Sequence, residues 1–292
     1  MGQSGLFAWR AAGMRPSPPQ PGDSGRRTHH RELKLRLAML QKEYSDLHAA
    51  LFEAAQVHRR LCAPRLVRCG AVDIASEIFA VRYLPGDFFT VEESGGSLIF
   101  ALGDVCGKGL AAGMWTPGVV GLVRAHAAAS SEPAAIVAGV NREFCRMHAP
   151  LTSLFMGRLD PTTGMLDYCS AGHPPALLLR AGGELECLSN GGMLLGMAAD
   201  APFRKGRVEL DPDDVLLAYS DGIIESRNDA DEEFGWERLE AHLRSARSAP
   251  AAAVLFSVLA AVQDFAAPHP LTDDTSLVVV RHRADVPTPG RT

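Results

Sequence analysis

Residues 102–113, LGDVCGKGLAAG, decide how this sequence of 292 residues is interpreted. The Gly-Lys-Gly at its centre first suggests a phosphate-binding loop. Such a P-loop has four residues between its first Gly and the Gly-Lys pair, and a Ser or Thr follows the Lys. Here three residues separate Gly103 from Gly107, and Gly109 stands at the position of the hydroxyl. The P-loop interpretation therefore fails, and Asp104, which ends an apolar segment, becomes the residue to explain.

Several Asp residues share the setting of Asp104. Asp221 ends the apolar run VLLAYS, Asp273 and Asp274 come just before SLVVV, and Asp87 opens another apolar segment. Carboxylates that meet in one cleft repel one another unless cations neutralise them, and Mg²⁺ and Mn²⁺ prefer oxygen ligands. An Asp beside a Gly also commonly marks a turn, and that alternative stays open for each residue taken alone.

Composition and charge limit the partners. The chain is 47% hydrophobic and 22% charged, as globular proteins are, and its net charge is −5. Residues 1–31 carry five Arg and one Asp, so the rest is more acidic, which argues against a nucleic-acid partner. We find no run of 18 apolar residues and no signal-peptide pattern, and the six Cys form no C-x-x-C pair. We therefore expect a cytoplasmic protein without a membrane span.

Four regions are expected along the chain. Residues 1–30, rich in Pro, Gly, Ser and Arg, are predicted to be a disordered leader, and residues 284–292 a disordered tail. Residues 31–63 are predicted to form a linker helix, and residues 67–283 the main domain. Apolar residues three and four apart form a heptad seam on the helix: Leu33, Leu37, Leu40, Tyr44, Leu47, Leu51, Ala54, His58 and Leu61. The seam favours a coiled coil that makes a homodimer, and a helix lying on its own domain is the alternative.

The main domain shows strand-like runs, then helices at about 108–128 and 132–148, then further strands, two helices and a last strand. This order predicts an α+β fold with antiparallel sheets and excludes a regular βαβ alternation. Pro117 falls inside the first of these helices, where a kink or an early end is expected.

Segments of this domain, in order, resemble the metal-dependent protein phosphatases of type 2C, in the bacterial SpoIIE-type branch that includes sigma-factor regulators. The matching segments, between about residues 54 and 281, include PGDFF, GDVCGKG, FMGRLDPTTGMLDYCSAGHPP, YSDGIIES and DDTSLVVV. The resemblance implies two antiparallel β-sheets packed face to face with helices on both outer sides, an αββα sandwich. It also implies hydrolysis of phosphoserine or phosphothreonine by a metal-activated water.

The resemblance further implies a ligand set for two divalent ions, Mn²⁺ or Mg²⁺. Asp104 would bridge both ions, and the carbonyl of Val105 would bind one of them. Asp221 and Asp273 would hold the other ion, and Asp87 would complete the site. One departure is Pro85, which replaces the first Gly of the usual G-G-D before Asp87 and could alter that loop.

Three basic residues lie near these motifs, and two of them are open to two interpretations. Arg82, five residues before Asp87, could hold the substrate phosphate through both ends of its guanidinium, or be an ordinary surface residue. His173, in AGHPP, is a possible general acid, but a packing role in a turn is favoured. Lys108 is predicted to be solvated surface.

The resemblance implies a phosphorylated regulatory protein, of the anti-sigma-factor antagonist type, as substrate, and a separate activator protein. The alternative is a catalytically silent phosphatase-fold protein that binds and sequesters the regulator. The complete set of acidic ligands favours the enzyme.

Overall fold

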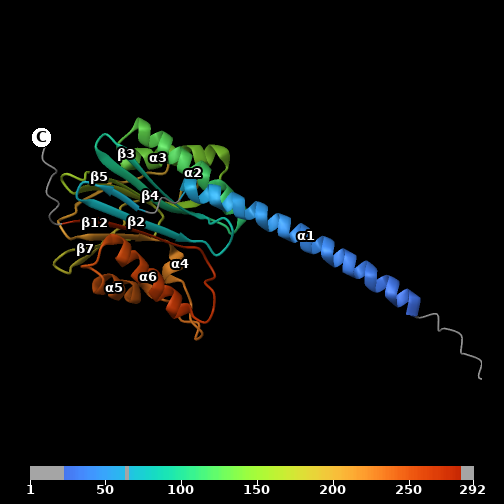
Figure 1. The fold of residues 1–292 in the computed structure, drawn as a ribbon. Coiled ribbons are helices and arrows are strands. Elements are labelled where there is room, and N and C mark those ends of the chain that lie inside the picture. The colour runs from blue at the N-terminus through green and yellow to red at the C-terminus, as the bar shows by residue number, and fades with distance from the viewer. Residues whose placement is uncertain (1–22, 63–65, 284–292) are drawn as a thin grey trace, which may run out of the picture. The chain divides into compact units, whose positions relative to one another are not determined.

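The computed structural model describes residues 23–62 and 66–283, shown in Figure 1. The chain divides into two compact units, residues 1–50 and residues 51–292, and each is described by itself. Residues 1–22 and 284–292, predicted to be disordered, lie outside the described residues. No helix in the described ranges has the length and apolar character needed to cross a membrane.

Helix α1 (Asp23–Cys62) belongs to both units. It begins earlier than expected, so the prediction of a disordered leader was wrong for residues 23–30. No Pro interrupts the segment, and it is rich in Leu, Lys, Arg, Glu and Ala, which favour helices.

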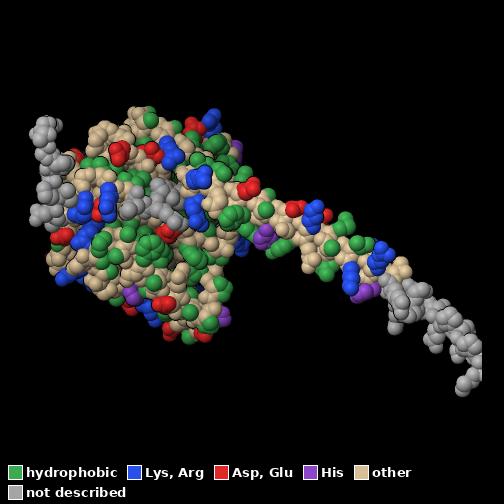
Figure 2. All heavy atoms as spheres, viewed as in Figure 1, with side chains coloured by type: hydrophobic (Ala, Val, Ile, Leu, Met, Phe, Trp, Pro, Cys, Tyr) green, Lys and Arg blue, Asp and Glu red, His purple; other side chains and the backbone are tan. Residues whose placement is uncertain are grey.

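The first part of the predicted seam is exposed. Along residues 31–50, its side chains are between 50% and 65% accessible: Leu33, Leu37, Leu40, Tyr44 and Leu47. Figure 2 shows apolar side chains among charged ones along this helix. A run of exposed apolar residues on one side of a helix marks an interaction surface.

The last turns of α1 belong to the second unit and pack on it. Leu51, Ala55, His58 and Cys62 lie three and four residues apart, and His58 and Cys62 are buried. The assignment of His58 to the coiled-coil seam was wrong, because its side chain instead contacts helix α2 (Leu110–Ala129).

Two antiparallel sheets form the centre of the second unit. In spatial order the first contains β1 (Leu66–Cys69), β2 (Val72–Phe79), β12 (Thr275–His282), β11 (Val215–Tyr219), β7 (Ala176–Leu179) and β8 (Leu185–Leu188). The second contains β10 (Gly206–Glu209), β6 (Met165–Ala171), β5 (Thr152–Leu159), β4 (Ser97–Val105) and β3 (Asp87–Ser94), with β9 (Gly191–Gly192) parallel beside β6.

Helices cover the outer face of each sheet, so the αββα prediction is confirmed (Figure 1). Helices α2 (Leu110–Ala129) and α3 (Pro133–Met147) cover the second sheet. Helices α5 (Gly235–Ser245) and α6 (Ala251–Ala266) cover the first. The short helix α4 (Asp221–Ile224) follows β11 directly.

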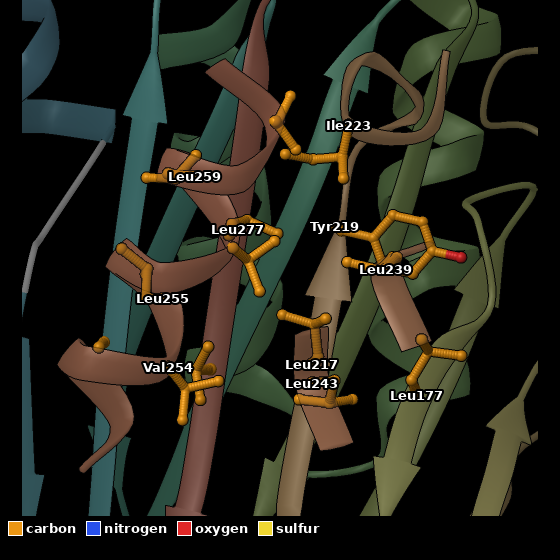
Figure 3. Close-up of a cluster of buried hydrophobic side chains, with 14 of the residues drawn as sticks. Leu177, Leu217, Tyr219, Ile223, Leu239, Leu243, Val254, Leu255, Leu259 and Leu277 are labelled. Carbon is orange, nitrogen blue, oxygen red and sulfur yellow. The ribbon is translucent and has the colours of Figure 1, made fainter. Parts of the chain in front are cut away.

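The apolar core has three layers, and β4 shows how the sequence builds two of them. Leu98, Phe100 and Leu102 point between the two sheets. Ile99 and Ala101 point the other way, toward α2 and α3. Strands buried on both faces are continuously apolar, as β4 is. The third layer joins the first sheet to α5 and α6 (Figure 3).

Helix α2 continues past Pro117, so of the two expected outcomes, a kink or an early end, the early end was wrong. Proline lacks an N–H, which leaves the carbonyl of Gly113, four residues earlier, without its helical partner. Two side chains replace it. The Thr116 hydroxyl donates to this carbonyl at 2.9 Å, and His58 Nε2 lies 3.0 Å from it. Burial lowers the pKa of His58, so the ring is neutral and can donate from Nε2.

The exposed seam predicts a dimer. We expect the full chain to sediment as a dimer at tens of micromolar, and the double variant Leu40→Glu, Leu47→Glu to sediment as a monomer, because charge cannot enter an apolar seam. Leu35→Glu is the matched control, since Leu35 is 59% exposed but lies off the seam. A monomeric wild-type chain in sedimentation velocity would contradict the prediction.

Candidate functional site

The predicted acidic residues gather where four strands begin or end. Asp87, the first residue of β3, lies opposite Asp104 near the end of β4. Asp221 follows the end of β11, and Asp273 precedes the start of β12, the antiparallel neighbour of β11. Strand β3 lies against β12 of the facing sheet, which brings the two pairs to one end of the sandwich.

Gly222 allows Asp221 to approach this end. A Cβ atom at position 222 would lie 2.0 Å from the carbonyl oxygen of Asp274, closer than any real contact. Any larger residue would push α4 away from the start of β12. The Gly of the Ser-Asp-Gly sequence therefore allows two backbone segments to lie close together, as well as allowing the chain to reverse.

Asp274 holds the segment that leads into β3. Its Oδ1 accepts the Val81 N–H at 2.9 Å, and its Oδ2 accepts the Gly86 N–H, also at 2.9 Å. Both carboxylate oxygens are thus committed to the backbone just before Asp87. Asp274 therefore fixes the backbone that leads to Asp87.

The carboxylates raise one another's pKa. Burial and the nearby Asp104 raise the pKa of Asp87, whose side chain is 2% exposed. Burial raises the pKa of Asp104 to about 6, and Asp221, Asp273 and Asp274 add to the effect. Such mutual repulsion favours bound cations.

Two observations test whether this set fits metal ions. Asp87 Oδ2 is buried and has no hydrogen-bond partner among the described residues. A Cβ atom at Gly86 would lie 3.0 Å from Asp104 Oδ1 and 3.1 Å from the Val105 carbonyl oxygen, so both oxygens border one small space. Oxygen donors that border one small space are suitable ligands for Mg²⁺ or Mn²⁺. Within the described ranges, no three His, Cys, Asp or Glu side chains already stand close enough to enclose an ion.

Lys108 is paired within the site, although the sequence suggested only solvated surface. Its ammonium donates to Asp273 Oδ2 at 2.6 Å. The hydrogen bond to Asp273 raises the pKa of Lys108. Both side chains remain about half exposed. Gly107 and Gly109, on either side of Lys108, both have positive φ.

Arg82 lies at the edge of the site. Its Nη1 is 3.2 Å from the position that a Cβ of Gly109 would take, at the start of α2. The positive charge of Arg82 opposes the rise in the pKa of Asp274, which burial dominates. Arg82 is itself exposed, so both interpretations of it stay open.

His173 takes the structural role that its sequence context favoured. It is buried, and its Nδ1 lies 2.8 Å from Ser153 Oγ. Burial lowers the pKa of His173 to about 3, and the backbone of Tyr219 opposes this only in part. A ring that stays neutral at physiological pH carries no acidic proton to donate.

Two features of the site were not predicted from the sequence. One is the pairing of Lys108 with Asp273, 165 residues away in the chain. The other is a hollow beside Asp104 whose walls include Ile224 and Trp236. In the sequence, a Trp directly after Gly235 is the only signal for the hollow. Gly235 has a positive φ and is the first residue of α5.

The two facing antiparallel sheets with helices on both outer sides are the fold of PP2C-type phosphatase domains. The SiaA-PP2C domain of Pseudomonas aeruginosa matches the fold with a TM-score of 0.69 and 20% identity, covering 85% of this chain and 100% of that one. The family model described as stage II sporulation protein E (SpoIIE) matches residues 94–283. The chain belongs to the SpoIIE family.

Two curated relatives extend the comparison. Phosphoserine phosphatase RsbU of Bacillus subtilis is 24% identical over 79% of this chain and 69% of its own length. Protein IcfG of Synechocystis sp. is 27% identical over 54% of this chain. The chain spans only 30% of the length of IcfG.

Removal of the Lys108 ammonium should strengthen metal binding. We expect Lys108→Met to bind Mn²⁺ about two- to fivefold more tightly in calorimetric titration, the scale of one exposed ion pair. Lys205→Met is the matched control, because Lys205 pairs with Glu132 at 2.9 Å outside this site. Weaker binding by Lys108→Met would show that the ammonium supports the ions instead of competing with them.

Buried His173 should make the fold sensitive to acid. The unfolded chain binds a proton at His173 below pH 6.5, whereas the folded chain does so only near pH 3, so stability falls as the pH drops below 6.5. Between pH 7.5 and pH 5 this loss is about 2 kcal/mol. We expect thermal melts of His173→Asn to change less over this range than wild type. The exposed His148→Asn is the control, and equal slopes in all three proteins would refute the assignment.

Proposed function

We propose that this chain is a metal-dependent phosphatase that removes the phosphate from phosphoserine or phosphothreonine on a regulatory protein. The observation that carries the proposal is the gathering of acidic side chains around the buried Asp87, whose Oδ2 lacks a partner among the described residues. A fold gains no stability from such an arrangement, since like charges brought close to a buried carboxylate repel it. A functional reason for it is therefore needed.

In this proposal Asp104, the Val105 carbonyl, Asp221, Asp273 and Asp87 would together hold two divalent ions, Mg²⁺ or Mn²⁺. When bound, the ions would supply a water of lowered pKa and neutralise charge on the phosphoryl oxygens. Asp274 keeps the Asp87 segment in place through its two backbone hydrogen bonds.

Arg82 is the proposed ligand of the substrate phosphate. Its guanidinium lies beside the start of α2, and no partner of its own is found for it among the described residues. A guanidinium can donate to two phosphoryl oxygens at once, which would orient the phosphorus for attack. His173, neutral and bonded to Ser153, would brace the wall of the site without transferring a proton.

The likeness to phosphoserine phosphatase RsbU supports phosphoserine as the group that is hydrolysed. A regulator of the anti-sigma-factor antagonist type, met in the cytoplasm, is part of the proposal. Dimerisation through α1 and control by a separate activator protein are part of the same proposal. The exposed seam of α1 supports the dimer.

The second candidate function is a silent binder that sequesters the regulator. The pairing of Lys108 with Asp273 favours it, because an ammonium already neutralises one proposed metal ligand. The pair is half exposed and therefore weak, so it opposes metal binding only slightly. We prefer the enzyme.

Hydrolysis of p-nitrophenyl phosphate with Mn²⁺ tests the proposal. We expect turnover that EDTA abolishes, and a loss of about 10²-fold or more in kcat for Asp104→Asn, because a preorganised electrostatic element is removed. Asp264→Asn, an exposed acid on α6, is the matched control. Turnover that survives chelation, or an Asp104→Asn enzyme of normal activity, would refute the mechanism. Tight binding of a phosphoprotein without turnover would establish the silent binder.

A further inference from the structure

A hollow of about 620 Å³ opens directly beside the acidic cluster. Asp104 and Asp221 are among the residues that line it, so whatever enters lies next to the proposed phosphate position. Its apolar lining comes from parts of the chain that lie far apart in sequence: Pro174, Leu194, Ile224 and Trp236. Ser153, His173 and Glu225 add polar groups to the lining. Ligand pockets typically have this size and this mixture of apolar walls with few polar groups.

Trp236 is the largest side chain in these walls, and 40% of it is exposed. A partly exposed Trp is a common anchor for partners, since it offers a large contact area with few rotatable bonds. Leu194 and Ile224 are half-buried beside the same space.

The chain around Trp236 is held firmly. The preceding Phe234 is buried in the layer below α5, and its N–H donates to the Ser226 carbonyl at 2.7 Å. Arg238 Nη1 donates to the Phe234 carbonyl at 3.1 Å. An isolated bridge between Arg227 and Glu233 closes the loop. The position of Trp236 is therefore fixed before any partner binds, which reduces the entropy lost on binding.

We propose that this hollow binds an apolar side chain of the phosphoprotein, close in sequence to its phosphorylated residue, and that Trp236 sets this specificity. The inference rests on the proposed phosphatase function. Its occupant is the substrate chain itself, because Asp104 and Asp221 line the same space as the apolar walls. A small aryl phosphate has no such side chain, so Trp236 should matter for peptides and not for small substrates.

Phosphoserine peptides test the inference. In a background of Gly and Ser, a single Leu is placed in turn at each position flanking the phosphoserine. We expect the wild-type chain with Mn²⁺ to prefer Leu to Ser at one position by about 10-fold in kcat/KM, mostly through KM. Trp236→Ala should abolish this preference and leave p-nitrophenyl phosphate hydrolysis unchanged. Phe256→Ala, which removes a 58% exposed aromatic ring on α6, should change neither.

Two results would overturn the inference. One is a wild-type chain that hydrolyses the peptides with no preference for Leu at any position. The other is an equal loss by Trp236→Ala on peptides and on p-nitrophenyl phosphate, which would indicate a structural role. If the wild type hydrolyses neither substrate, the proposed function fails. Calorimetric binding of the Leu and Ser peptides to wild type and Trp236→Ala then still decides whether the hollow selects an apolar residue.

Discussion

Repulsion among the carboxylates at one end of the sandwich is the constraint on which the arrangement of the site depends. Asp87 and Asp104 face each other across paired strands, and the charge of Asp104 adds to burial in raising the pKa of Asp87. Asp221, Asp273 and Asp274 add to burial in raising the pKa of Asp104. The three apolar layers must therefore hold these strand ends together against their own electrostatics. A preorganised site of this kind stores unfavourable energy that a bound cation relieves. The same energy explains why stability alone could not have produced the cluster.

The segment of residues 80–86 connects this cluster with the rest of the fold. Asp274 fixes its backbone from the C-terminal motif. On its other side a small cavity separates the segment from the end of α1, with His58, Tyr83 and Pro85 in its lining. The Val105 N–H donates to the Gly86 carbonyl, which ties the segment to the end of β4. A displacement of the last turns of α1 would thus change the position of Asp87 through residues 80–86.

Much of this could be predicted from sequence, because strand ends and helices have local signals. The apolar run before Asp104 predicted β4, and the Gly after Asp221 predicted a sharp change of direction. The heptad pattern predicted α1 but not its partners, since a seam gives no information about which surface covers each residue. His58 fits both a seam and a docking face, and only the position of α2 decides between them.

Long-range compensation explains the remaining errors. Proline breaks a helix when the carbonyl that it frees finds no other partner, and one of the two side chains at the Gly113 carbonyl is His58, 55 residues away. The pair Lys108–Asp273, 165 residues apart, is likewise invisible to local patterns. Both cases arise where elements meet in the folded chain.

The division of labour at the site follows from the same distinction. Acidic residues at strand ends can hold cations and phosphate, but that chemistry is shared by every phosphate monoester and cannot select a protein. Selection must come from surfaces that contact the rest of the substrate. In this fold Ile224, at the end of α4, and Trp236, near the start of α5, flank the loop between these helices and line the hollow beside the acidic cluster. The loop between them is closed by its own hydrogen bonds, which hold the start of α5 in place independently of the strands. Carboxylates placed at strand ends and a recognition residue placed at the start of a separate helix form an arrangement in which specificity can change while catalysis is retained.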